Sequence, residues 1–236
     1  MTDTARSRNI LAAGLIALCL SIALFAKPIH AQEPADFSQP DPSLPAPTPP
    51  PISSHYLQYG VAVTGETVAS PGQVCPRGTS GLPCILGDGG GMLLRLGYRS
   101  RGPWYLGGAY EFSRQDSANL LRLAILQQLR AELRLHLTRV TRLSPYLVAS
   151  LGGALYGNEW GLDTWGGVSG LGAGLAFQVT PSILLNVALN YRQLFLHRWT
   201  DGAGEERATG LPLDFGLAHI VALEFGFEIR SPLSRW

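Results

Sequence analysis

Residues 120–137 (LLRLAILQQLRAELRLHL) contain many helix-forming residue types but repeat with a period that no helix has. Eight of the nine odd positions from 121 to 137 are apolar, against three of the nine even positions from 120 to 136. Strand side chains alternate between two faces, so a strand here has one apolar and one polar face. A helix would spread its Arg, Gln, Glu and His side chains around the axis and bury no apolar stripe. The segment is therefore predicted to be a strand.

Seven further segments show the same alternation. They cover residues 56–65, 92–99, 104–113, 145–157, 168–179, 183–192 and 215–229. Most of the eight are long enough to cross a bilayer as tilted strands, which takes about 9–11 residues. The sequence therefore predicts an all-β fold, with eight strands crossing a membrane.

The connections between these segments alternate in length. Short links lie at 100–103, 138–144 and 180–182, whereas 66–91, 157–167 and 196–214 are longer; 114–118 is a short exception. Short periplasmic turns and long external loops are the arrangement of outer-membrane barrels. The fold class expected is an eight-stranded antiparallel transmembrane up-and-down β-barrel over residues 55–230, with its N-terminus in the periplasm and a C-terminal tail at 231–236.

The second face of the strands favours a membrane barrel, with a soluble periplasmic barrel as the structural alternative. On 168–179 it is made of Gly170, Gly172, Gly174 and Ala176, which suit a crowded lumen better than a water-facing surface. The apolar face is uniform except for His219, which is expected at the outer interface. Aromatic residues near the strand ends predict two interfacial girdles, one near the short turns (Tyr98, Trp104, Tyr146) and one near the long loops (Tyr110, Phe112, Trp160, Trp165, Tyr191, Phe195, Trp199).

The inward face would then be charged. An eight-stranded barrel is only just wide enough for its side chains to fill, and buried charges must be paired. A polar network that plugs the barrel is favoured over a conducting path. Its members are Arg95, Glu111, Arg122, Arg130, Glu132, Arg134, His136, Arg192, Glu224 and Glu228, with Gln128, Asn186 and Asn190 as neutral neighbours.

The N-terminus has the features of a targeting segment. Arg6 and Arg8 precede an apolar run from 10 to 26, and Ala31 offers a cleavage site, so residues 1–31 are expected to be a signal peptide. An uncleaved anchor is the alternative. Residues 32–54 hold eight prolines between 34 and 51, which cannot build a core and indicate a periplasmic linker.

The mature chain would keep two cysteines, Cys75 and Cys84, in the longest connection. In an exported protein they most simply form a disulfide, and a metal site is not expected from two thiols without a nearby histidine. The stapled loop could bind a partner, or the disulfide could only resist proteolysis; the second is favoured.

These features together resemble the small eight-stranded outer-membrane barrels of Gram-negative bacteria, the OmpA/OmpX/OmpW-like group, over about residues 55–230. The resemblance is architectural and implies no specific activity. One departure concerns the C-terminus. Such proteins often end on a strand with a terminal aromatic, but here Pro232 interrupts the pattern and Trp236 is out of phase with Phe225 and Phe227.

Three functions are open at this point. The first is a non-enzymatic barrel with a structural or surface-interaction role, and the second is a narrow small-solute channel. The third, a lipid-modifying enzyme, would need a nucleophile and a base, for which Ser169, His197 and His219 are loose candidates. A net charge of +1 argues against nucleic acid as a partner. The expected partners are outer-membrane lipid, lipopolysaccharide and the barrel-assembly machinery, with a monomeric protein and no cofactor.

Overall fold

The computed structural model describes residues 55–75, 84–116, 123–138, 142–158, 161–200, 204, 206–209 and 213–233. The expected signal peptide and the whole of the expected linker, together with Arg122, Trp160 and Trp236, lie outside these residues. Within the described part, no helix is long and apolar enough to cross a membrane.

Eight long strands make up the described fold. They are β1 (Tyr56–Ser70), β2 (Gly89–Arg99), β3 (Trp104–Gln115), β4 (Ala124–His136), β5 (Leu143–Asn158), β6 (Thr164–Thr180), β7 (Ile183–His197) and β10 (Phe215–Pro232). A single 3-10 turn, η2 (Gly72–Val74), follows β1, and a small hairpin of β8 (Trp199–Thr200) and β9 (Glu206–Arg207) lies between β7 and β10.

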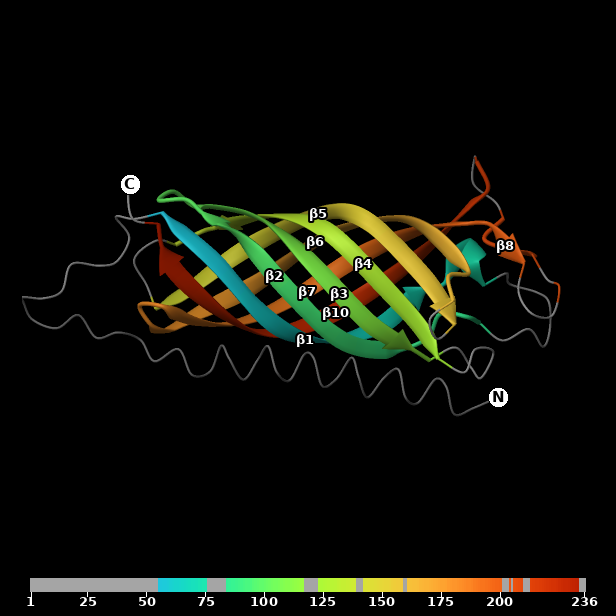
Figure 1. Cartoon of the computed structure of the whole chain (residues 1–236), viewed down its shortest axis with the longest axis horizontal. Coiled ribbons are helices and arrows are strands. Elements are labelled where there is room, and N and C mark those ends of the chain that lie inside the picture. The colour runs from blue at the N-terminus through green and yellow to red at the C-terminus, as the bar shows by residue number, and fades with distance from the viewer. Residues whose placement is uncertain are drawn as a thin grey trace, which may run out of the picture. The chain divides into compact units, whose positions relative to one another are not determined.

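The eight strands close into one antiparallel barrel (Figure 1). Each strand pairs with its sequence neighbours, and β1 completes the circle by pairing with β10, from Tyr56 opposite Pro232 to Ser70 opposite His219. Tyr56 and Pro232 lie at the end of the barrel that carries the short turns, which is the periplasmic end in barrels of this type. The predicted eight-stranded up-and-down barrel is confirmed.

Most strands are longer than the sequence predicted, such as β1, which ends at Ser70 and not at 65, and two other boundaries need comment. Leu123 lies in a bend, and β4 begins at Ala124, so the connection from β3 is longer than the alternation suggested. At the other terminus, β10 continues through Ser231 to Pro232 instead of ending at 230. Proline is acceptable there because it occupies the end of a strand, where the loss of one N–H matters least.

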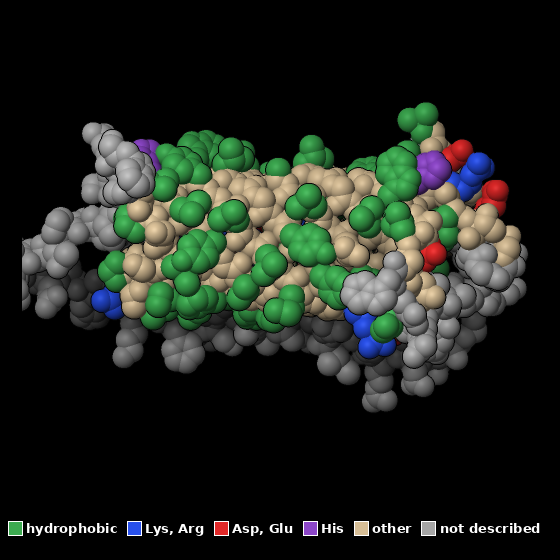
Figure 2. Space-filling view, viewed as in Figure 1, with side chains coloured by type: hydrophobic (Ala, Val, Ile, Leu, Met, Phe, Trp, Pro, Cys, Tyr) green, Lys and Arg blue, Asp and Glu red, His purple; other side chains and the backbone are tan. Residues whose placement is uncertain are grey.

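The two faces of the wall have opposite polarity. Large apolar side chains point outward on every strand, with exposures such as 65% for Leu129, 69% for Leu151 and 68% for Leu171. In the view of Figure 2 they cover the middle of the barrel, and charged side chains gather toward its two ends. The charged residues of the strand centres point inward and are buried. An apolar outer surface around a charged interior is the polarity of a barrel in a membrane.

The outward apolar run has the same length on five strands. It covers nine residues in each case: 104–112 on β3, 129–137 on β4 and beyond its end, 171–179 on β6, 183–191 on β7, and 221–229 on β10. The next outward position toward the long loops is polar on all five strands. We call these residues the outer polar ring: Arg114, Gln127, Ser169, Gln193 and His219. We call the outward apolar runs together the membrane-facing belt, and the outer polar ring marks its outer edge.

Candidate functional site

Arg134 occupies the periplasmic half of the lumen. Its guanidinium donates to Glu132 and to Glu228, at 2.9 Å each, and its side chain is 1% exposed. The rings of Tyr105 and Tyr146 lie near the same guanidinium, with their centroids 4.8 and 5.3 Å from its central carbon. Both rings can lie this close because they belong to inward positions of β3 and β5. The aromatic faces and the two carboxylates together hold one cation across the barrel.

Arg95 joins this group to the middle of the lumen. It donates to Glu132 at 3.1 Å and pairs with Glu224, while Glu228 lies 3.8 Å away. Arg95 comes from β2 and Glu224 from β10, so the ion pair connects the two strands on either side of β1.

Arg192 and Arg130 form the outer part of the network. Arg192 contacts Glu66 at 2.7 Å, Glu111 at 2.9 Å and Glu224 at 2.5 Å. Arg130 contacts Glu111 at 2.8 Å and donates to the Gln128 side chain at 2.6 Å. The ion pairs therefore run without a break from Glu228 near the periplasmic end to Glu66 near the outer end.

The sequence-predicted lumen residues are mostly in this network. Eight of the ten take part in its ion pairs: Arg95, Glu111, Arg130, Glu132, Arg134, Arg192, Glu224 and Glu228. His136 is buried in the lumen but takes part in none of these ion pairs. Its Nδ1 instead contacts the Ser144 hydroxyl at 3.1 Å, and its ring packs near Tyr146. Arg122 lies outside the described residues.

Sequence reasoning missed Glu66. It placed this residue in a loop, whereas β1 continues to Ser70 and points Glu66 inward. There it accepts hydrogen bonds from Gln115 (2.5 Å) and Gln128 (3.4 Å) besides its pair with Arg192. The alternation that makes Thr64 an inward residue continues to Glu66 and was the available signal.

Tyr146 is a second difference. It was expected in the periplasmic girdle, but it is 2% exposed and lies inside the barrel. Its position in the sequence is close to a short turn, yet its parity is that of the inward residues Val148 and Ser150. Parity, not distance from the turn, decides which face a strand residue occupies.

An apolar cluster closes the outer end of the barrel above the ionic network. Four of its side chains come from the connection between β1 and β2, namely Val74, Cys75, Ile85 and Leu86. They pack on inward residues of the outer strand ends: Ala124, Leu126, Ala154, Tyr156, Val168, Leu194, Leu196, Ala218 and Ile220. We call this cluster the outer stopper. Its side chains are at most 9% exposed, so apolar packing fills this part of the barrel.

Specific contacts hold the connection in place. The Tyr156 hydroxyl donates to the Ile85 carbonyl, and the Gln73 side chain accepts from the Leu217 N–H at 3.0 Å. The disulfide expected between Cys75 and Cys84 is present and joins the two described parts of this connection, one on each side of residues 76–83. These flanking parts of the connection lie in the barrel mouth, which the sequence did not indicate; residues 76–83 are outside the described part.

The loose enzymatic candidates are not assembled into a site. Ser169 and His219 both pair with Gln193, from β6 and β10, so β7 lies between them. His219 Nδ1 contacts the Tyr191 hydroxyl at 2.6 Å, and the ring of His197 stacks on Trp165. Among the described residues, no group of His, Cys, Asp and Glu side chains could hold a metal ion.

A closed eight-stranded barrel with an ion-paired interior and an apolar wall defines the class of this protein: it is a small outer-membrane β-barrel.

Solved structures with a similar fold include Neisserial surface protein A, at 16% identity over 74% of this chain and 96% of that chain, with a TM-score of 0.46. OprG from Pseudomonas aeruginosa has 12% identity over 76% of this chain and 97% of its own, with a TM-score of 0.44. Ail, the attachment invasion locus protein of Yersinia pestis, has 14% identity, covers 75% and 98%, and has a TM-score of 0.41. No protein-family model matches the sequence. No curated protein matches it either.

Proposed function

We propose that this protein is a sealed, non-enzymatic outer-membrane barrel. Its role is structural or depends on contacts of its external face, and solutes do not pass through its lumen. One observation carries the proposal: a continuous network of four arginines and five glutamates fills the described lumen. The outer stopper, which lies above it, adds support.

The two barriers act on an ion in different ways. An ion moving through the network must separate buried pairs, and leaving one buried charge without its partner costs about 3–5 kcal/mol. The Tyr156 hydroxyl in the outer stopper is already bonded to the Ile85 carbonyl, and the other stopper side chains have no oxygen or nitrogen to replace the ion's water. Apolar constrictions of this kind close pores by excluding water. In series, the two barriers oppose both ions and small polar solutes.

Single-channel recording of the refolded mature protein in a planar bilayer tests this proposal. The gel shift between heated and unheated samples first establishes that the barrel has folded. We expect no steady conductance from the wild-type protein. Glu132→Gln removes a carboxylate that contacts Arg95 and Arg134, and Glu206→Gln is the matched control at an exposed ion pair with Arg198.

A narrow channel is the competing function, and the same recordings distinguish it. A channel would give steady conductance in the wild-type protein, and Glu132→Gln would change its size or its preference for anions while Glu206→Gln would not. That result would refute the sealed barrel. Silence from a folded, heat-modifiable protein would direct the search for function to the external face.

We extend the proposal to the partners of such a barrel. The protein is a monomer, its wall is surrounded by outer-membrane lipid, including lipopolysaccharide, and the barrel-assembly machinery inserts it. The support for this is that the apolar outer face continues around all eight strands. Cross-linking of the protein in native membranes tests the monomer, because a stable dimer would give a discrete doubled band.

A further inference from the structure

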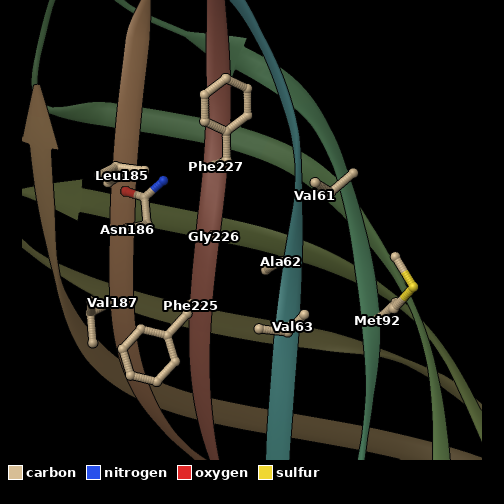
Figure 3. Close-up of a pocket in the computed structure, with 10 residues that line it drawn as sticks. All are labelled: Val61, Ala62, Val63, Met92, Leu185, Asn186, Val187, Phe225, Gly226 and Phe227. Carbon is tan, nitrogen blue, oxygen red and sulfur yellow. The ribbon is translucent and has the colours of Figure 1, made fainter. Parts of the chain in front are cut away.

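Two grooves in the described part of the outer wall differ in character. The larger, of about 400 Å³, lies over Gly226 on β10. In Figure 3, Phe225 and Phe227 stand on either side of Gly226, and Val61 and Val63 lie on the neighbouring strand. The outward side chains around it are apolar, and it lies within the membrane-facing belt. Acyl chains fill such a surface without any polar contact.

The smaller groove, of about 230 Å³, includes a hydrogen-bonding group. It lies over Gly153 on β5 and is lined by Tyr110, Gln127, Leu155 and Trp165 among others. The Tyr110 hydroxyl donates to Gln127 Oε1 at 2.9 Å, which fixes the orientation of the amide. Gln127 Nε2 makes no hydrogen bond to any described residue, so its N–H groups remain available beside the groove.

The floor of this groove is formed by backbone. Gly153 is paired with Gly167 on β6, so two adjacent strands lack a side chain at neighbouring outward positions. A Cβ at Gly153 would meet no heavy atom closer than the Gly166 carbonyl oxygen at 3.7 Å. Since neighbouring strands are about 4.8 Å apart, the bare strip has the width of a single acyl chain.

The level of the groove in the membrane is a further observation, beside its free amide and its backbone floor. Gln127 belongs to the outer polar ring, and Leu129 is the first residue of the apolar run on β4. The groove therefore crosses the level at which the hydrocarbon region ends. In a bilayer this is the level of the ester or amide carbonyl that joins an acyl chain to its headgroup.

We propose that the groove over Gly153 binds one acyl chain of an outer-leaflet lipid, with Gln127 Nε2 donating a hydrogen bond to the carbonyl at the root of that chain. The lipid class is one whose chains are joined through an ester or amide. A concave strip one chain wide fits this occupant, whereas a second copy of the protein would require a far larger complementary surface, about 800 Å² on each partner. The site does not depend on whether the lumen conducts.

Trp165 lines the groove and is 55% exposed, so its fluorescence reports the lipid beside it. The protein is reconstituted in vesicles of ether-linked dialkyl phosphatidylcholine, which has no carbonyl. A minor fraction of ester-linked phosphatidylcholine, brominated in the upper part of its chains, is added as the quencher. Subtracting the signal of Trp165→Phe isolates Trp165 from the other tryptophans. Exchanging the bromine label between the two lipids gives the reciprocal measurement.

We expect the ester lipid to be enriched next to Trp165 by about 3-fold to 10-fold over its mole fraction, the range that one net hydrogen bond provides. Gln127→Leu removes the donor, Gly153→Leu fills the groove, and each should abolish the enrichment. Gly108→Leu is the matched control, because this outward glycine also has open space around it and is not part of the groove. The gel shift establishes that each variant has folded.

Three results would overturn the proposal. Quenching that follows the mole fraction in both label arrangements would mean that the groove does not select a carbonyl. Enrichment that survives Gln127→Leu would mean that this amide is not the donor. A Trp165 protected from every brominated lipid, together with a cross-linked dimer, would mean that a second copy covers the groove.

Discussion

Replacing Arg192 by methionine tests whether the lumen network stabilises the barrel. Arg192 is 1% exposed and contacts Glu66, Glu111 and Glu224 within 3 Å. Methionine keeps most of the length of the side chain and removes its charge. Three carboxylates would then lose a cation that they share, in a part of the barrel that water reaches poorly.

The expected loss of stability follows from two opposing effects. With an effective dielectric constant of about 20, a pair of charges about 4 Å apart attracts by about 4 kcal/mol, so three pairs amount to about 12 kcal/mol. Desolvation of the charges offsets most of this attraction. Removing one partner of a buried ion pair typically costs about 3–5 kcal/mol, and Arg192→Met should lie at the upper end of that range because three partners are affected.

Unfolding by urea in lipid vesicles, followed by tryptophan fluorescence and by gel shift, gives the measurement. Arg198→Met is the matched control, since Arg198 also has two carboxylate neighbours, at 3.9 and 3.6 Å, but is 44% exposed. Its replacement should change the free energy of unfolding by less than about 1 kcal/mol. An Arg192→Met barrel as stable as the Arg198→Met barrel would refute the reasoning, because it would mean that water already screens the lumen charges.

Three further predictions concern the outer stopper and the crowded lumen. Replacing Cys75 and Cys84 together by serine should lower the free energy of unfolding by about 2–3 kcal/mol, and the same urea titration under non-reducing conditions measures it. Ile85→Ala should cost about 2–5 kcal/mol in that titration, because Ile85 is 1% exposed in the stopper. Gly174→Ala should cost about 1–3 kcal/mol and reduce the yield of heat-modifiable protein, since its Cβ would lie 2.5 Å from the ring of Tyr146.

The barrel and most of its interior could be predicted because both depend on one local property. The alternation of apolar and polar residues determines which face of a strand a side chain occupies, and strand pairing does not change it. Eight of the ten proposed lumen residues therefore reach the ionic network. Glu66 was missed only because β1 was taken to end at Gly65, and Tyr146 was misplaced only because its distance from a turn was given more weight than its parity.

The outer stopper could not be predicted in the same way. Val74, Ile85 and Leu86 belong to a connection without a repeating pattern, so the sequence gives no indication of the direction in which they point. Their destination depends on the strands. Beyond the outer polar ring the inward positions of β7 and β10 are apolar without interruption, at Leu194, Leu196 and Ile220 among others, and this apolar mouth is what draws the connection inward.

The uniform apolar run of nine residues has a consequence for the surrounding bilayer. Eight steps of about 3.3 Å, along strands tilted by about 40°, give a hydrophobic height of about 20 Å. The hydrocarbon core of a typical bilayer is about 30 Å thick. A single helix can meet such a mismatch by tilting. A closed barrel with polar residues at the outer rim on five of its eight strands gains no hydrophobic height by tilting. In any bilayer thicker than this height, including a thin outer membrane to a lesser degree, the lipids adapt by shortening beside the protein, so that each copy carries a shell of thinned membrane with it.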